Sequence, residues 1–250
     1  MAKLERALFA AQPPATPPEG FSRLYYGAEF CFWRLPDPIK IRQTIRWCRD
    51  AGWPLTLVTP VVGEEERLRL ARLLAEVVPL LEAGDELLIS DWAALELVRS
   101  NSTELPIVLG RALSGQKRGP RILDMSLSAE QQSYFQKGCW HNQQSLALLA
   151  EHSIARIEQD NLLQGLAPLP KPLKGSLHLP YAMVTSSRNC PFRLTAKDDP
   201  CPAPCGELFT LKAQDTDILL YQDGNAQFLR NDRAPNDLTS LGIDRLVFTP

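Results

Sequence analysis

Net charge and long apolar runs are both scarce in this sequence. The 27 basic and 29 acidic side chains nearly cancel, leaving a formal net charge of −2 at pH 7. A broad nucleic-acid-binding surface normally carries a strong basic excess, so this balance argues against nucleic acid as a partner. No apolar run reaches the length that a membrane-spanning helix needs, and we expect no membrane span.

The first twenty residues lack the pattern of a secretory signal. The stretch MAKLERALFAAQPPATPPEG starts with a basic residue, but Glu5 and Arg6 interrupt its short apolar patch and prolines follow. We expect residues 1–20 to form a flexible N-terminal arm and the protein to be cytoplasmic. In that reducing compartment, disulfides are a poor explanation for the six cysteines.

Familiar catalytic signatures are missing as well. The sequence contains no HExxH zinc motif, no phosphate-binding Walker loop, no dinucleotide-binding glycine fingerprint and no Ser-His-Asp order. A peptidase or another hydrolase would therefore need a site that these motifs do not describe.

Strand-like and helix-like segments alternate through most of the chain. Apolar runs typical of strands occur in RLYYGAEF, PLTLVTP, ELLISDW, PIVLG, SIARIEQD and SLHLPYAMVTS. Helical spacing follows at Pro38 to Gly52, Glu64–Glu82, up to about Ser100, Ala129–Lys137 and Asn142–His152. Repeated strand–helix–strand units imply parallel pairing with right-handed crossovers. The sequence predicts an α/β fold, a complete or partial (β/α) barrel over residues 21–205, with an open doubly wound sheet as the alternative.

The last part of the chain has a different pattern. GELFTLK, DILLYQDGNAQFLR and DRLVFTP are strand-like without intervening helices, and Asp223-Gly224 between two apolar runs is a hairpin signal. We expect residues 206–250 to form a small antiparallel appendage.

Four of the six cysteines stand out as metal ligands. Cys190, Cys201 and Cys205 lie within sixteen residues in a proline-rich, polar segment, where a loop can wrap thiolates around a metal. Cys31 follows the first predicted strand, and Cys190 follows the sixth. Strand ends of a parallel α/β fold share one face, so Cys31 can supply the fourth thiolate.

Thiolates suit iron–sulfur clusters or zinc. We favour a cluster, because the paired short C-x-x-C knuckles typical of zinc are absent. Zinc stays open as the alternative. Cys48, in an amphipathic helix, and Cys139, beside Trp140, are interpreted as structural thiols.

Other polar residues also fall at the expected strand ends. Carboxylates and a histidine there could do acid–base chemistry or bind a polar substrate: Glu29, Asp91, Glu158, Asp160 and His178. Ion pairs and helix caps are the structural alternative, and His178 fits a satisfied core histidine. A basic loop could bind a small anionic substrate through Arg111, Lys117, Arg118 and Arg121, or could simply be solvated.

These same segments resemble the collagenase-like peptidases of unknown catalytic type, family U32. The matching pieces are GAEFC at Gly27–Cys31, LLISDWAAL at Leu87–Leu95, LGRALSGQKRGPRI at Leu109–Ile122, ARIEQDN at Ala155–Asn161, PYAMVTSSRNCPF at Pro180–Phe192, and the Cys201–Cys205 pair. They occur in the family's order, and the resemblance is closest to its iron–sulfur branch, which includes paired proteins of oxygen-independent ubiquinone biosynthesis.

The resemblance implies a barrel-like fold and a 4Fe-4S cluster on Cys31, Cys190, Cys201 and Cys205. It implies oxygen-independent hydroxylation or a related redox modification, with a homologous protein as a partner. Two alternatives remain at this point: a peptidase with an unrecognised site, and a binding module stabilised by zinc.

Overall fold

A closed barrel of eight parallel strands forms the body of the molecule. The computed structural model describes residues 4–102, 104–193, 199–214 and 216–250. Around the barrel the strands follow the order β1-β12-β7-β6-β5-β4-β3-β2, and β1 closes the ring by pairing with both β2 and β12. Their bounds are β1 Glu5–Phe9, β2 Arg23–Gly27, β3 Leu55–Val58, β4 Glu86–Ile89, β5 Ile107–Leu109, β6 Arg156–Asp160, β7 Lys174–Leu179 and β12 Ile243–Phe248.

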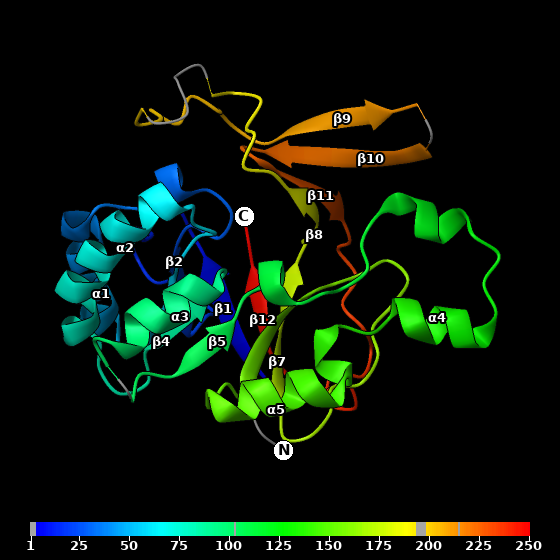
Figure 1. Cartoon of the computed structure of the whole chain (residues 1–250), viewed down its shortest axis with the longest axis horizontal. Helices are drawn as coiled ribbons and strands as arrows, with labels where there is room; N and C mark the ends of the chain where they lie inside the picture. The colour runs from blue at the N-terminus through cyan, green and yellow to red at the C-terminus, as the bar shows by residue number, and fades with distance from the viewer. Residues whose placement is uncertain (1–3, 103, 194–198, 215) are drawn as a thin grey trace.

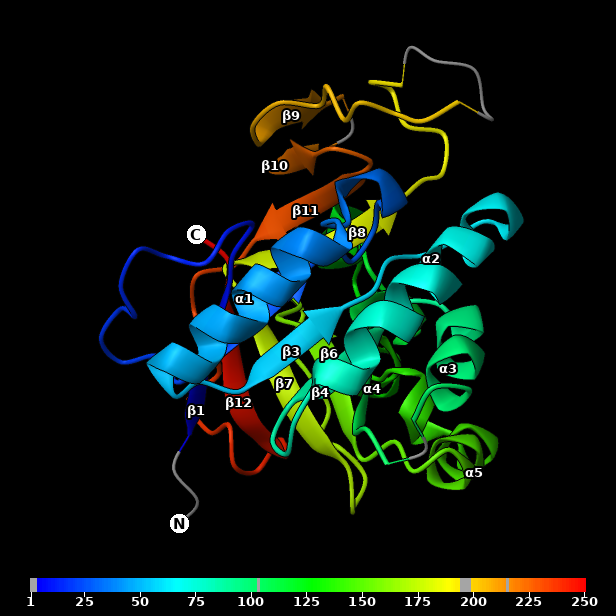
Figure 2. The same ribbon diagram turned by 90° about the vertical axis from the view of Figure 1, so that its left-hand side faces the viewer.

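Helices cover part of the outside of this barrel. They are α1 Pro38–Ala51, α2 Glu64–Val77, α3 Trp92–Arg99, α4 Ala129–Phe135 and α5 Gln143–Glu151. Helices α1, α2 and α3 lie side by side against β2, β3 and β4 (Figures 1 and 2). The side chain of Asp37 caps α1 by accepting from the Lys40 N–H, and Gly52 ends it in the left-handed conformation.

Alternation along the strands separates two apolar cores. One set of strand side chains packs outward and shares a buried cluster with helix residues; Leu57, Leu70 and Leu74 belong to it. The other set points inward and includes Val58, Leu88 and Val247. The expectation of an α/β barrel with an antiparallel appendage is therefore confirmed.

The two ends of the chain differ from the sequence-based boundaries. Residues 5–9, expected within a flexible arm, form β1, which pairs with strands on both of its sides. Residues 243–248, expected in the appendage, form β12, which lies between β1 and β7 in the barrel. Both strands are short, and their flanks do not indicate a parallel barrel strand: prolines follow β1, and no helix directly precedes β12.

The antiparallel sheet has the order β8-β11-β10-β9 and lies over the carboxyl ends of the barrel strands (Figure 1). Its strands are β8 Tyr181–Ser186, β9 Phe209–Ala213, β10 Thr216–Asp223 and β11 Ala226–Arg230. The predicted sixth strand is in fact two, since it breaks at Pro180: β7 stays in the barrel, and β8 enters the antiparallel sheet. The predicted hairpin at Asp223-Gly224 joins β10 to β11.

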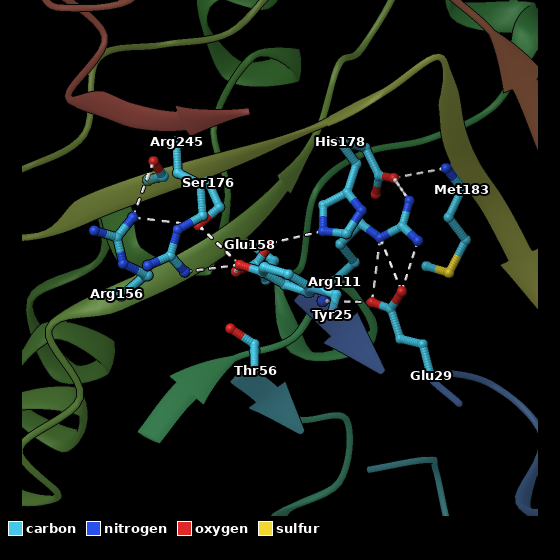
Figure 3. A network of polar contacts seen from close by, with 12 residues as sticks. Tyr25, Glu29, Thr56, Arg111, Arg156, Glu158, Ser176, His178, Met183 and Arg245 are labelled. Carbon is cyan, nitrogen blue, oxygen red and sulfur yellow. Dashed lines mark hydrogen bonds and ion pairs between the residues drawn. The ribbon is translucent and has the colours of Figure 1, made fainter. Parts of the chain in front are cut away.

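A polar network lies inside the barrel (Figure 3). The Tyr25 hydroxyl donates to Glu158 at 2.9 Å and accepts from Arg245 at 2.8 Å. Arg245 also pairs with Glu86 and with Glu5. The network gives each of these charged groups a partner. Because Tyr25 and Glu158 come from opposite strands of the barrel, it also links the two sides of the barrel.

Candidate functional site

The four cysteines that the sequence singled out line one cavity at the carboxyl end of the barrel. Cys31 lies just past β2 and precedes a 3₁₀ turn at Phe32–Arg34. Cys190, Cys201 and Cys205 lie in the segment between β8 and β9. All four side chains contribute to a cavity of about 620 Å³, here called the cysteine cavity. The fold therefore brings Cys31 to the other three although it is far from them in sequence.

Backbone N–H groups point at the sulfur atoms of this cavity. The Ala203 N–H donates to the Cys201 sulfur at 3.4 Å. Burial raises the pKa of the Cys31 thiol, the N–H groups of Trp33 and Arg34 lower it in part, and the nearby sulfurs of Cys190 and Cys205 raise it further. The net pKa lies above the ordinary thiol value, so a metal that binds here must displace the Cys31 proton.

Cationic side chains border the same cavity. Arg188 and Arg193 are among its lining residues, and Arg188 donates to the Val62 carbonyl at 3.2 Å. The Arg193 guanidinium lies 5.6 Å from the centre of the Trp33 ring. Three glutamates at the start of α2, Glu64 to Glu66, also line the cavity and add negative charge to its wall. The cavity therefore combines soft thiol ligands with guanidinium groups that can offset thiolate charge.

The donor set fits an iron–sulfur cluster. Within the described ranges, no three Cys, His, Asp or Glu side chains converge as the ligands of a single ion would. A zinc ion needs its four donors within roughly 2.0–2.3 Å of one point. A cluster instead takes each thiolate on a different iron atom, so the sulfurs stand apart around a common volume. Four soft thiol donors on the walls of one cavity suit the chemistry of such a cluster.

A second, smaller cavity adjoins the first at the mouth of the barrel. This mouth cavity has a volume of about 200 Å³, and most of its wall is apolar. Aromatic residues from the barrel ends and from the antiparallel sheet line it: Phe9, Phe30, Tyr181 and Phe228. The two cavities share Phe30, Cys31 and Asn225 as lining residues. A molecule in the mouth cavity would therefore lie directly beside one cysteine of the other cavity.

Glu29, Asp160, Arg111 and Arg118 form one buried network beside the mouth cavity (Figure 3 shows its Glu29–Arg111 part). The Arg111 guanidinium contacts Glu29 at 2.6 Å and Asp160 at 3.0 Å. Asp160 also pairs with Arg118 at 2.7 Å and accepts from the Met183 N–H at 2.7 Å. The network joins β2, β5 and β6 to β8, so it fixes the antiparallel sheet over the barrel.

This pairing changes the interpretation of the basic loop. Burial by itself raises the pKa of the Asp160 carboxyl, but Arg118 and Arg111 lower it below its ordinary value. The guanidiniums of Arg111 and Arg118 are already paired with buried carboxylates. The expectation was a loop that is solvated or binds an anion. Lys117 donates to the Lys137 carbonyl at 3.0 Å and lies 4.4 Å from the centre of the Tyr134 ring. Of the four predicted substrate-binding residues, Arg111 lines the mouth cavity, and the other three line neither of the two cavities. Arg121 lies in the 3₁₀ turn Pro120–Asp124.

The remaining acid–base candidates lie away from the cavity walls. Asp91 caps α3 by accepting from the Ala93 N–H at 2.9 Å. Glu158 and His178 are buried in the barrel, where the His178 Nε2 contacts Glu158 at 2.6 Å. Burial opposes ionisation of Glu158, yet His178 and Arg245 lower its pKa below the ordinary value. None of these three lines either cavity, whereas Glu29 lines the mouth cavity.

Sequence reasoning missed the contribution of the β10–β11 turn to the site. Asp223 and Asn225 line the mouth cavity, and Gly224 and Asn225 line the cysteine cavity. The Asp-Gly signal predicted a hairpin, but no local pattern showed which surface its tip would meet. Cys48 is buried in α1, with a pKa that burial raises to about 12, and Cys139 lies away from both cavities.

Comparison with known proteins extends only to the fold. No family model and no curated protein sequence matches the chain. Within the described residues, no helix is both long and apolar enough to cross a bilayer. A similar fold occurs in the solved structure titled "The Structure of the U32 Peptidase Mk0906", with a TM-score of 0.52 and 10% sequence identity over 100% of this chain and 94% of that one. The similarity therefore extends to the fold of the barrel and its antiparallel sheet.

Proposed function

We propose that this protein binds a 4Fe-4S cluster on Cys31, Cys190, Cys201 and Cys205 and takes part in a redox modification. The observation that carries the proposal is the shared cavity of four cysteines from two distant segments. N–H groups directed at sulfur and bordering arginines are the surroundings that tune such clusters. Zinc remains the alternative occupant, with a binding module as its function.

A cluster bound here would supply one-electron transfer at the edge of the mouth cavity. Cavities of about 150 Å³ lined by apolar side chains accept a single benzene ring. The mouth cavity, at about 200 Å³, therefore suits one ring or a molecule of similar size. Phe9, Phe30 and Phe228 would hold its apolar part.

We infer oxygen-independent hydroxylation of such a molecule as the reaction that fits best. This chain's residues would bind and orient the substrate and keep water out through the antiparallel sheet above the mouth. Replacing a C–H bond by C–OH with an oxygen atom from water releases two electrons and two protons, so a separate electron acceptor must take up the two electrons. A homologous protein partner and a cytoplasmic location belong to the same proposal.

A peptidase is the second candidate, because the similar solved structure is named as one. The mouth cavity contains a carboxylate, Glu29, but it is held by Arg111 and is 4% exposed. A general base for hydrolysis would need that carboxylate to reach a water molecule.

Anaerobic purification separates these candidates. The proposal predicts a brown protein with about four iron atoms and four acid-labile sulfides per chain. A colourless protein with one zinc ion would support the binding module. A metal-free protein that cleaves peptides would support the peptidase, and either result would reject the cluster.

A further inference from the structure

The turn between β10 and β11 lies where the two cavities meet. Its residues are Asp223, Gly224 and Asn225, and they form part of both cavity walls. The turn belongs to the antiparallel sheet, so it reaches the site from a different element than either cysteine-bearing segment. This placement gives it contacts to both segments at once.

Asn225 joins the two cysteine-bearing segments through one side chain. Its amide Nδ2 donates to the Phe30 carbonyl at 2.9 Å and to the Ser187 carbonyl at 3.0 Å. The Ser187 N–H donates back to the Asn225 carbonyl at 2.9 Å. Phe30 directly precedes Cys31, and Ser187 stands three residues before Cys190. The position of one predicted ligand relative to the others therefore depends on this amide.

Asp223 and Gly224 fix a cation beside the sulfur of Cys205. Asp223 pairs with the Arg34 guanidinium at 2.7 Å. Gly224 has φ +54°, and a Cβ built on it would lie 3.4 Å from the Arg34 Nη1 and 3.6 Å from the Cys205 sulfur. Arg34 and Cys205 therefore both lie against this turn, and a side chain longer than Cβ would have to displace one of them.

We propose that the Asp223–Asn225 turn is the positioning element of the cluster site. It holds the Cys31 segment and the Cys205 segment at a fixed separation, and it closes the cysteine cavity on the side of the mouth cavity. The inference rests on the proposed function, because the group that the turn positions is the cluster.

Two substitutions test the turn, each with a matched control. Asn225→Asp keeps the side-chain shape but removes both donors, placing a carboxylate against two carbonyls. Its control is Asn142→Asp, which makes the same charge change at the exposed cap of α5, where either side chain accepts from N–H groups.

Gly224→Asn adds a side chain that tolerates the left-handed conformation but reaches toward Cys205. Its control is Gly52→Asn, since Gly52 has φ +67° and nothing within 4 Å of an added Cβ. Both controls should behave as the unaltered protein, because they reproduce the charge or the backbone change away from the site.

The measurements are iron and sulfide content after anaerobic purification, and the rate at which cluster absorbance is lost in air. We expect Asn225→Asp to lose the cluster about tenfold faster than its control, because losing two ordinary hydrogen bonds corresponds to a factor of this order. Gly224→Asn should also lose the cluster faster than its control, because its side chain crowds Arg34 and Cys205. Thermal unfolding of the metal-free proteins shows whether each variant is folded. If either variant does not fold, Asp223→Asn, which alters an ion pair exposed by about a third, serves in its place.

The outcomes separate this inference from the proposed function. Equal rates in the variants and their controls, with a cluster in the unaltered protein, would overturn the positioning role and leave the proposed function standing. An unaltered protein that takes up no iron and sulfide would overturn both.

Discussion

Replacing Arg111 by methionine should destabilise the protein far more than an exposed arginine substitution does. The Arg111 side chain is 5% exposed and contacts two carboxylates whose side chains are at most 2% exposed. Without the guanidinium, Glu29 keeps the Arg111 backbone N–H at 3.1 Å, while Asp160 keeps Arg118. Breaking a buried pair costs roughly 3–5 kcal/mol, and we expect about 3 kcal/mol because Asp160 retains a partner.

Urea denaturation followed by circular dichroism measures this cost, and thermal denaturation provides a second measurement. A loss of about 3 kcal/mol corresponds to a midpoint temperature lower by roughly 6–12 °C in a chain of this size. The control is Arg42→Met, which breaks an exposed pair with Glu76 on neighbouring helices at 3.1 Å. Exposed pairs of this kind contribute up to about 1 kcal/mol.

The double variant Arg111→Met with Glu29→Gln completes the test. Glutamine can still accept from the backbone N–H at position 111 but carries no charge, so much of the lost stability should return. We expect a coupling energy of about 1–3 kcal/mol between the two positions. If Arg111→Met costs no more than Arg42→Met, the guanidinium is not a structural tie, and the loop would regain its solvated or anion-binding interpretation.

Three further predictions follow from the fold and the site. Deleting residues 1–10 should abolish cooperative unfolding, because β1 closes the barrel; an unchanged transition would return this segment to a flexible arm. Asp160→Asn should reduce the loss of unfolding free energy in acid. The pKa of the Asp160 carboxyl is lowered in the fold, so its ionised form stabilises the protein above the ordinary pKa of 3.8, and this contribution is lost as the pH falls below 3.8. An unaltered dependence of stability on pH would contradict the pairing. Cys48→Ala and Cys139→Ala should retain full iron and sulfide, since neither thiol lines the cysteine cavity, and iron loss in either would add that thiol to the ligands.

Much of the barrel was predictable because its strands and helices carry strong local patterns. Helix α2 has apolar residues at helical spacing and acids in its first turn, so its start at Glu64 follows from sequence alone. Its end does not: the periodic pattern runs on to Glu82, but Pro79 interrupts it and the helix ends at Val77. The short strands β1 and β12 were misplaced because their role depends on pairing with distant strands, which local pattern does not encode.

The site was predictable to the extent that it depends on chemistry and on shared strand ends. The proximity of Cys31 to the distant cysteines is predictable, because parallel strands bring their carboxyl ends to one face. The pairing state of Arg111 and Arg118 could not be predicted, because an arginine in a loop looks the same whether it meets water or a buried carboxylate. The role of Asn225 also depends on where a hairpin tip docks, and only the tertiary structure determines that.

The cluster itself provides the most direct test of the account. Iron and acid-labile sulfide should be measured after anaerobic purification in the unaltered protein and in Cys31→Ala, Cys190→Ala, Cys201→Ala and Cys205→Ala. We predict about four of each in the unaltered protein. We also predict that Cys31→Ala loses as much cluster as Cys190→Ala, since both line the same cavity. A Cys31→Ala protein with full iron and sulfide, or an unaltered protein with neither, would contradict the central claim.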